Sequence, residues 1–87
     1  MKVKQNSIVL FNTIKKNEYG LLNPLTKKLH RINETGRFIW ETCKEARSTD
    51  ELASMMAEHF HIPIKTAQKD VNEFIDRMVS FGLLEEW

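Results

Sequence analysis

The sequence predicts an α+β fold, in which a three-stranded antiparallel sheet at the N-terminus is followed by three helices. The first third contains short β-branched and aromatic runs separated by polar turns, a pattern typical of strands. The remainder has apolar residues at the three- and four-residue spacing of helices, with a capping sequence between two of them. The chain has 87 residues, of which 41% are hydrophobic, so we expect a single domain over residues 1–87 with one small core.

Three short strands are expected between residues 7 and 32. The β-branched run Ser7 to Thr13 predicts the first, and a polar turn separates it from the second, Tyr19 to Asn23. The second strand ends before Pro24, because proline has no N–H to donate to a strand ladder. The third strand is Lys28 to Ile32, whose residues alternate between two faces. Since it comes last in the meander, we expect it to form an edge of the sheet.

Two helices with recognisable starts follow the strands. Asn33 is a residue type that caps helix N-termini, and we expect the first helix to begin after it. Ser48 to Glu51 matches a capping box, in which the serine and glutamate side chains satisfy free backbone amides reciprocally. The predicted apolar faces are Phe38, Ile39, Trp40, Thr42 and Cys43 in the first helix, and Leu52, Met55, Met56, His59 and Phe60 in the second.

The third helix is expected to be the longest. Pro63 fits its first position, where a missing N–H costs nothing, and Gly82 fits the left-handed residue that ends it. The order of elements resembles a winged helix-turn-helix with the wing displaced to the N-terminus. The predicted apolar face is Ala67, Val71, Phe74, Ile75, Met78 and Phe81.

The net charge of +1 conceals a separation of charge along the chain. Residues 1–37 hold eight basic and two acidic residues, and residues 38–87 hold five basic and ten acidic ones. Such asymmetry can orient a charged partner. No apolar run approaches the roughly 18 residues of a membrane span, and the N-terminus lacks the features of a secretory signal. With Cys43 as the only cysteine, we expect a cytoplasmic protein without a membrane partner.

Residues suited to catalysis or metal binding are sparse. His59, His61 and Cys43 lack the second pair of ligands that a zinc site requires. Cys43 also lies on an apolar stripe, where a free cysteine packs as a small hydrophobic residue. The three glycines are far apart in sequence and cannot form a phosphate-binding loop. We therefore expect no metal, no cofactor and no enzymatic activity.

Two binding functions remain from the residues alone. A DNA-binding helix should be basic, but Ile64 to Ser80 contains three basic and three acidic residues. A winged-helix DNA-binding regulator is therefore the weaker alternative, and we expect no nucleic acid partner. The edge strand Lys28 to Ile32 could pair with an extended peptide. Alternatively, Lys27, Lys28 and Arg31 only protect this edge from aggregation, and the pattern does not separate these two interpretations.

Three segments, taken in order, resemble the PqqD-like family. Leu29 to Trp40 has a strand, then Ile-Asn-Glu-Thr-Gly, then apolar residues ending in tryptophan. Ser48 to Leu52 is similar to the start of that family's second helix. Asp70 to Ile75, followed by Phe81 to Leu84, is similar to its third helix and closing Gly-Leu-Leu. The resemblance covers about residues 8 to 86.

The resemblance implies a recognition element for ribosomally synthesised and post-translationally modified peptides (RiPPs). Such domains bind the leader of a precursor peptide as an extra strand beside the third strand and against the third helix. We therefore expect a stand-alone adaptor that serves a separate modifying enzyme, protease or radical-SAM maturase. A lasso peptide pathway is the first expectation, and a radical-SAM pathway of the pyrroloquinoline quinone type is the next. The implied peptide-binding residues are Lys28, Leu29, His30, Arg31, Ile32, Ala67, Asp70, Val71 and Phe74.

Two residues depart from the family pattern. His30 stands where a tyrosine is common, and Arg37 where a small apolar residue is common. Because His30 and Arg31 lie in the implied groove, they are expected to mark a particular leader specificity. The basic strand suggests a leader with acidic or polar content. Since an exposed edge can exchange strands, we expect either a monomer or a strand-exchanged dimer.

Overall fold

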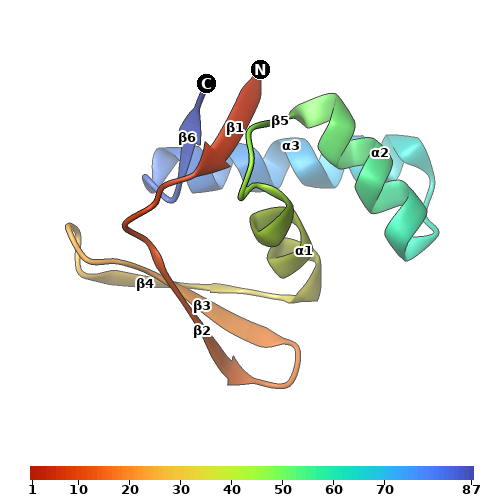
Figure 1. Ribbon diagram of the computed structural model, residues 1–87. Coiled ribbons are helices and arrows are strands. Elements are labelled where there is room, and N and C mark those ends of the chain that lie inside the picture. The colour runs from red at the N-terminus through yellow and green to blue at the C-terminus, as the bar shows by residue number, and fades with distance from the viewer.

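The computed structural model describes residues 1–87 and confirms the α+β class, with a three-stranded antiparallel sheet followed by three helices (Figure 1). The strands lie in the order β2-β3-β4, so that β4 is an edge strand, as the sequence predicts. The likeness to a winged helix-turn-helix stays a prediction. The elements are β2 (Leu10–Lys15), β3 (Glu18–Asn23), β4 (Lys28–Ile32), α1 (Glu34–Thr42), α2 (Thr49–Phe60) and α3 (Ile64–Ser80).

A second small sheet was not predicted. It places β1 (Lys2–Gln5) between β5 (Arg47–Ser48) and β6 (Leu84–Glu86), with both pairs antiparallel. The two termini of the chain therefore lie side by side (Figure 1). Val3 is fully buried, and the Gln5 side chain donates a hydrogen bond to the Trp40 carbonyl oxygen at 2.6 Å. This sheet ties the N-terminus to the three helices.

The first strand of the larger sheet begins later than predicted. Ser7 to Thr13 was expected, but residues 6–9 form a turn between the two sheets, in which the Val9 N–H donates to the Asn6 carbonyl oxygen. The Asn6 side chain also donates to the Gly82 carbonyl oxygen at 2.9 Å. The β-branched residues Ile8 and Val9 are thus part of a turn that tertiary hydrogen bonds hold in place. The strand consequently runs from Leu10 to Lys15.

The helix ends follow the predicted capping residues. Asn33 accepts a hydrogen bond from the Gly36 N–H, and both bonds of the Ser48–Glu51 capping box are present. Pro63 was expected at the first position of α3, but the helix begins one residue later, at Ile64, and Pro63 directly precedes it. Gly82 adopts the left-handed conformation with φ of +72°. Local sequence signals therefore place the helices to within about one residue.

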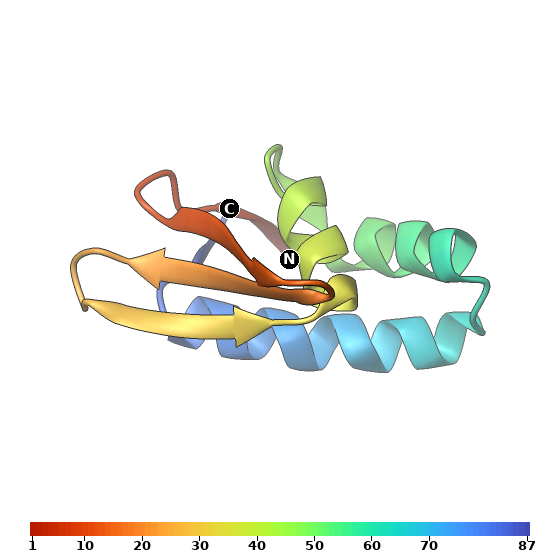
Figure 2. The same ribbon diagram turned by 90° about the horizontal axis from the view of Figure 1, so that it is seen from below.

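The core lies where α3 packs against α2 and the inner face of the larger sheet. Figure 2 shows α3 running alongside β4, the strand of that sheet nearest to it. The inner face of α3 is buried at Ala67, Val71, Phe74, Ile75 and Met78. Other core side chains include Leu21 and Ile32 from the sheet, Ile39 and Trp40 from α1, and Leu52 and Met56 from α2.

Cys43 is a packing residue in this core. Its side chain is fully buried, and burial raises the pKa of the thiol to about 12. No group of three or more His, Cys, Asp or Glu side chains is arranged to hold a metal ion. None of the three helices is both long enough and apolar enough to cross a membrane.

Candidate functional site

The larger sheet has two free edges, and they differ in regularity. On β2, the pairing with β3 is interrupted by a register shift between Thr13 and Lys15. On β4, all five residues pair with β3 without interruption, from Lys28 to Ile32. Bulges are one way in which proteins block an edge against further pairing. The uninterrupted β4 edge is therefore the better template for an added strand.

The hairpin between β3 and β4 determines which backbone groups face outward. Lys27 has a left-handed conformation with φ of 59°, and its N–H donates to the Asn23 carbonyl oxygen at 2.8 Å. A tight loop closes on a hydrogen-bonded pair, so we assign Asn23 and Lys28 as that pair. Hydrogen-bonded and non-hydrogen-bonded residue pairs alternate along an antiparallel pair of strands. Leu29 and Arg31 are therefore not hydrogen-bonded to β3, and they direct their N–H and C=O groups toward the free edge.

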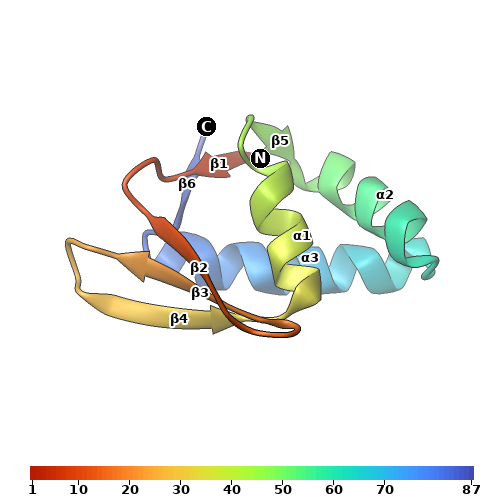
Figure 3. The ribbon, with the colours of Figure 1, turned by 60° about the horizontal axis from the view of Figure 1, so that its bottom comes forward.

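Helix α3 forms a wall beside this edge. Figure 3 shows β4 at the border of the sheet, and Figures 2 and 3 agree that it runs along the direction of α3. At one end, the His30 ring stacks on Phe81, which directly follows α3, with 4.3 Å between ring centroids. At the other end, Ile32 and Phe74 both lie close to Gly36, where a Cβ atom would be 2.8 Å from the Phe74 ring. Close packing at these two points fixes the separation of β4 from α3.

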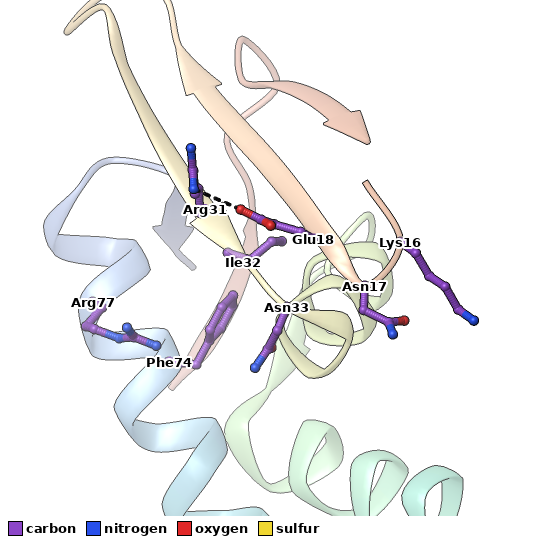
Figure 4. Close-up of a pocket in the computed structure, with 8 residues that line it drawn as sticks. All are labelled: Lys16, Asn17, Glu18, Arg31, Ile32, Asn33, Phe74 and Arg77. Atoms are coloured by element: carbon purple, nitrogen blue, oxygen red, sulfur yellow. Dashed lines mark ion pairs between the residues drawn. The ribbon is translucent and has the colours of Figure 1, made fainter. Parts of the chain in front are cut away.

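Two adjoining cavities form a groove between the end of β4 and α3, which we call the β4–α3 groove. The first has a volume of about 430 Å³, and Figure 4 shows Ile32 above Phe74 among its lining residues, with Arg77 beside the Phe74 ring. The second, of about 240 Å³, continues over the start of α1 to Asp70 on α3. Asn33, Phe74 and Arg77 line both cavities, so the two are continuous.

Most of the sequence-predicted strand residues lie at this edge. Lys28, Leu29 and Arg31 are exposed, His30 is half-buried and Ile32 is buried. The Leu29 side chain lies on the outer face of the sheet, where it covers Gly20. It therefore contributes backbone groups to the edge rather than a side chain to the groove.

The four α3 residues that the sequence predicts to bind a peptide fall into two groups in the structure. Asp70 and Phe74 line the β4–α3 groove. Ala67 and Val71 are fully buried and have no surface to offer a peptide. The sequence had left open which residues of this helix face the core and which face the groove, and burial now separates them.

Several groove residues were missed by the sequence analysis. Glu73 and Arg77 line the groove on the same helical face as Asp70 and Phe74. Glu73 follows Asp70 by three residues and Arg77 follows Phe74 by three residues, a helical spacing that could have identified them. Lys16 and Asn17, in the turn between β2 and β3, also line the first cavity. They are brought there by tertiary structure alone, and no local pattern indicates it.

Arg37, one of the departures from the family pattern, uses its guanidinium group in contacts within the protein. It donates to the Tyr19 hydroxyl at 3.1 Å and forms ion pairs with Glu34 and Glu41. The Tyr19 hydroxyl in turn donates to Glu34 at 2.5 Å, and this hydrogen bond, together with burial, raises the pKa of Tyr19. The network joins β3 to the start of α1 and leaves Arg37 no part in the groove.

Comparisons with known proteins give two matches. The sequence profile described as "Coenzyme PQQ synthesis protein D (PqqD)" matches residues 18–84. The chain is also similar to a solved structure titled "TbiB1 in Complex with the TbiA(beta) Leader Peptide", with a TM-score of 0.81 and 21% sequence identity. That similarity covers 97% of this chain and 96% of the other. None of the curated proteins compared matches the chain.

Proposed function

The chain belongs to the PqqD family, and on that premise we propose that it binds the leader of a ribosomally synthesised precursor peptide by strand addition at β4. The bound leader extends the larger sheet, and α3 forms the wall against which its inward side chains pack. TbiB1, which shares this fold, was solved in complex with a leader peptide. Backbone pairing supplies affinity in such complexes, while side-chain pockets supply selectivity.

The observation that carries this proposal is the uninterrupted β4 edge beside a groove. All five β4 residues keep regular register with β3, and the β4–α3 groove begins where β4 ends. A peptide paired with β4 can thus continue into the groove without a change of direction. The other edge, on β2, has a register shift and borders neither α3 nor the groove.

The proposed role is that of an adaptor whose bound peptide is processed by another protein. The one cysteine is buried with its thiol pKa raised to about 12, so it does not supply a nucleophile to the groove. We propose a modifying enzyme, a protease or a radical-SAM maturase as the partner, with a lasso peptide pathway first and a pyrroloquinoline quinone-type pathway next. Gene neighbourhood tests this choice, because a short precursor gene beside a maturase or protease gene would identify the pathway.

Fluorescence polarisation tests the proposed peptide binding. The probe is the labelled N-terminal half of each short peptide encoded next to the chain's gene, with a scrambled version as a negative control. Arg31→Pro removes an N–H that we assign to the free edge of β4. Loss of the one hydrogen bond that this N–H donates should weaken binding up to roughly tenfold. Circular dichroism should show that the helices remain folded.

Thr13→Pro is the matched control on the other edge. It places proline on exposed β2, so peptide affinity should stay within about twofold of the unmodified protein, as for other surface substitutions outside a binding site. Equal binding by the folded Arg31→Pro variant would contradict strand addition at β4. Loss of binding only in Thr13→Pro would assign the peptide to β2 instead.

A further inference from the structure

The β4–α3 groove contains charged side chains that have no partner within the protein. Asp70, Glu73 and Arg77 line it, and none of the ion pairs in the structure includes any of them. They also take part in no side-chain hydrogen bond through their charged groups. By contrast, Arg31 on β4 is paired with Glu18 at 3.0 Å, and Arg37 on α1 is paired with Glu34 and Glu41. The groove charges are therefore available to a bound molecule.

The two signs of charge occupy different ends of the groove. Lys16 and Arg77 are the unpaired basic side chains that line the first cavity, because Arg31 is paired there with the one carboxylate, Glu18, which also pairs with Lys15. The second cavity has Asp70 and Glu73 as its carboxylates, with Arg77 at the boundary. A peptide lying along the groove thus meets positive charge beside β4 and negative charge farther along α3.

Arg77 is placed to read an acidic side chain. It projects from α3 toward Phe74, and its guanidinium lies 6.0 Å from the centroid of that ring (Figure 4). Phe74 and Ile32, which are almost fully buried, form the apolar floor of the cavity beside it. Arginine also binds carboxylates through two parallel hydrogen bonds, which fixes the position of the partner.

The distances between these charges along the axis of α3 determine how many residues would separate the matching charges in an extended peptide. Glu73 and Asp70 precede Arg77 by four and seven residues. At the helical rise, these separations are about 6 and 10 Å along the axis. An extended strand covers such distances in about two and three residues. Because β4 runs along α3, an added strand follows the same direction.

We propose that the groove selects leader peptides with an acidic side chain for Arg77 and a basic side chain two or three residues away for Asp70 and Glu73. This inference rests on the proposed function, because it takes the peptide to lie along β4. The charge pair would fix both the register and the direction of the leader. A peptide inserted in the reverse direction would place like charges together at both ends.

Selection from a phage-displayed library of random 14-residue peptides tests this inference, and it does not require the sequence of the leader. Peptides enriched on the unmodified protein should share an Asp or Glu with a Lys or Arg two or three positions from it. Arg77→Glu should weaken those peptides about fivefold or more, and a peptide with Lys in place of the shared acidic residue should recover binding to it. Arg77→Gln should give an intermediate loss. Lys69→Glu, on the same helix but outside the groove, should have no effect.

Two outcomes separate failure of this inference from failure of the proposed function. Enriched peptides that lose binding to Arg31→Pro but show no charge pattern, or bind Arg77→Glu equally well, would refute the charge selection alone. No enrichment on the unmodified protein, or enriched peptides that still bind Arg31→Pro, would overturn the proposed function and this inference with it. Thermal melts of each variant distinguish lost binding from lost folding.

Discussion

Gly36 links the fold of α1 to the geometry of the groove, and replacing it with alanine tests that link. A Cβ atom at this position would lie 2.8 Å from Cε1 of Phe74 and 3.0 Å from Cβ of Ile32. Ile32 and Phe74 both line the first cavity, so alanine at Gly36 pushes directly on the groove. The glycine is thus required by close approach, since its backbone is ordinary helix.

The expected cost follows from two opposing effects. Overpacking of a buried contact destabilises a protein by about 1–3 kcal/mol. Alanine in place of glycine in a helix raises the free energy of unfolding by up to about 1 kcal/mol, because alanine has the higher helix propensity. With about 1 kcal/mol offset, the net loss in free energy of unfolding is up to about 2 kcal/mol, which lowers the Tm of a domain this small by up to about 15 °C. Because Phe74 must shift, peptide affinity should fall as well.

Thermal denaturation and fluorescence polarisation measure both effects, and Gly20→Ala is the matched control. A Cβ at Gly20 would also come within 2.8 Å of a neighbour, but that neighbour is the end of the exposed Leu29 side chain. This flexible group can move aside on the outer face, so Tm should change by less than about 4 °C and peptide binding should be retained. A Gly36→Ala protein as stable as the Gly20→Ala protein, with unchanged affinity, would refute the reasoning.

Three further predictions concern stability, reactivity and the alternative function. The hydrogen bonds of the capping box lower the pKa of Glu51 below its ordinary value of 4.5, so its ionisation stabilises the fold above that pH and the benefit disappears as pH falls through the lowered pKa. The Tm difference between the unmodified protein and Glu51→Gln should accordingly shrink between neutral pH and about pH 3. Cys43 should resist alkylation by iodoacetamide in the folded protein and react after unfolding in denaturant, whereas rapid native-state labelling would contradict its burial. Duplex DNA should give no salt-dependent shift in an electrophoretic titration, because α3 has equal numbers of acidic and basic side chains, and a steep salt dependence would favour the DNA-binding alternative.

Local patterns predicted the larger sheet and the helix ends well, because each depends on neighbouring residues. The caps at Asn33 and Ser48 and the left-handed Gly82 are set by hydrogen bonds and φ preferences within one turn. The second sheet was missed because its strands have only two to four residues and pair residues far apart in the chain, such as Val3 with Glu86. Segments this short carry no measurable periodicity.

The candidate site could be predicted only in part, for a related reason. The edge position of β4 follows from the order of the strands along the chain. The faces of α3 needed the structure, because Phe74 lines the groove while the likewise apolar Ala67 and Val71, seven and three residues before it on the helix, are fully buried. The contribution of Lys16 depends on a hairpin turn folding toward the end of β4, which no spacing in the sequence encodes.

Amide hydrogen exchange by NMR tests the central claim most directly, using a peptide enriched from the library. Strand addition at β4 predicts that the Leu29 and Arg31 amides, which face the free edge, become protected when the peptide is added. Amides on the free edge of β2, such as Thr13, should exchange at unchanged rates. Protection that appears at β2 while Leu29 and Arg31 continue to exchange freely would contradict the account.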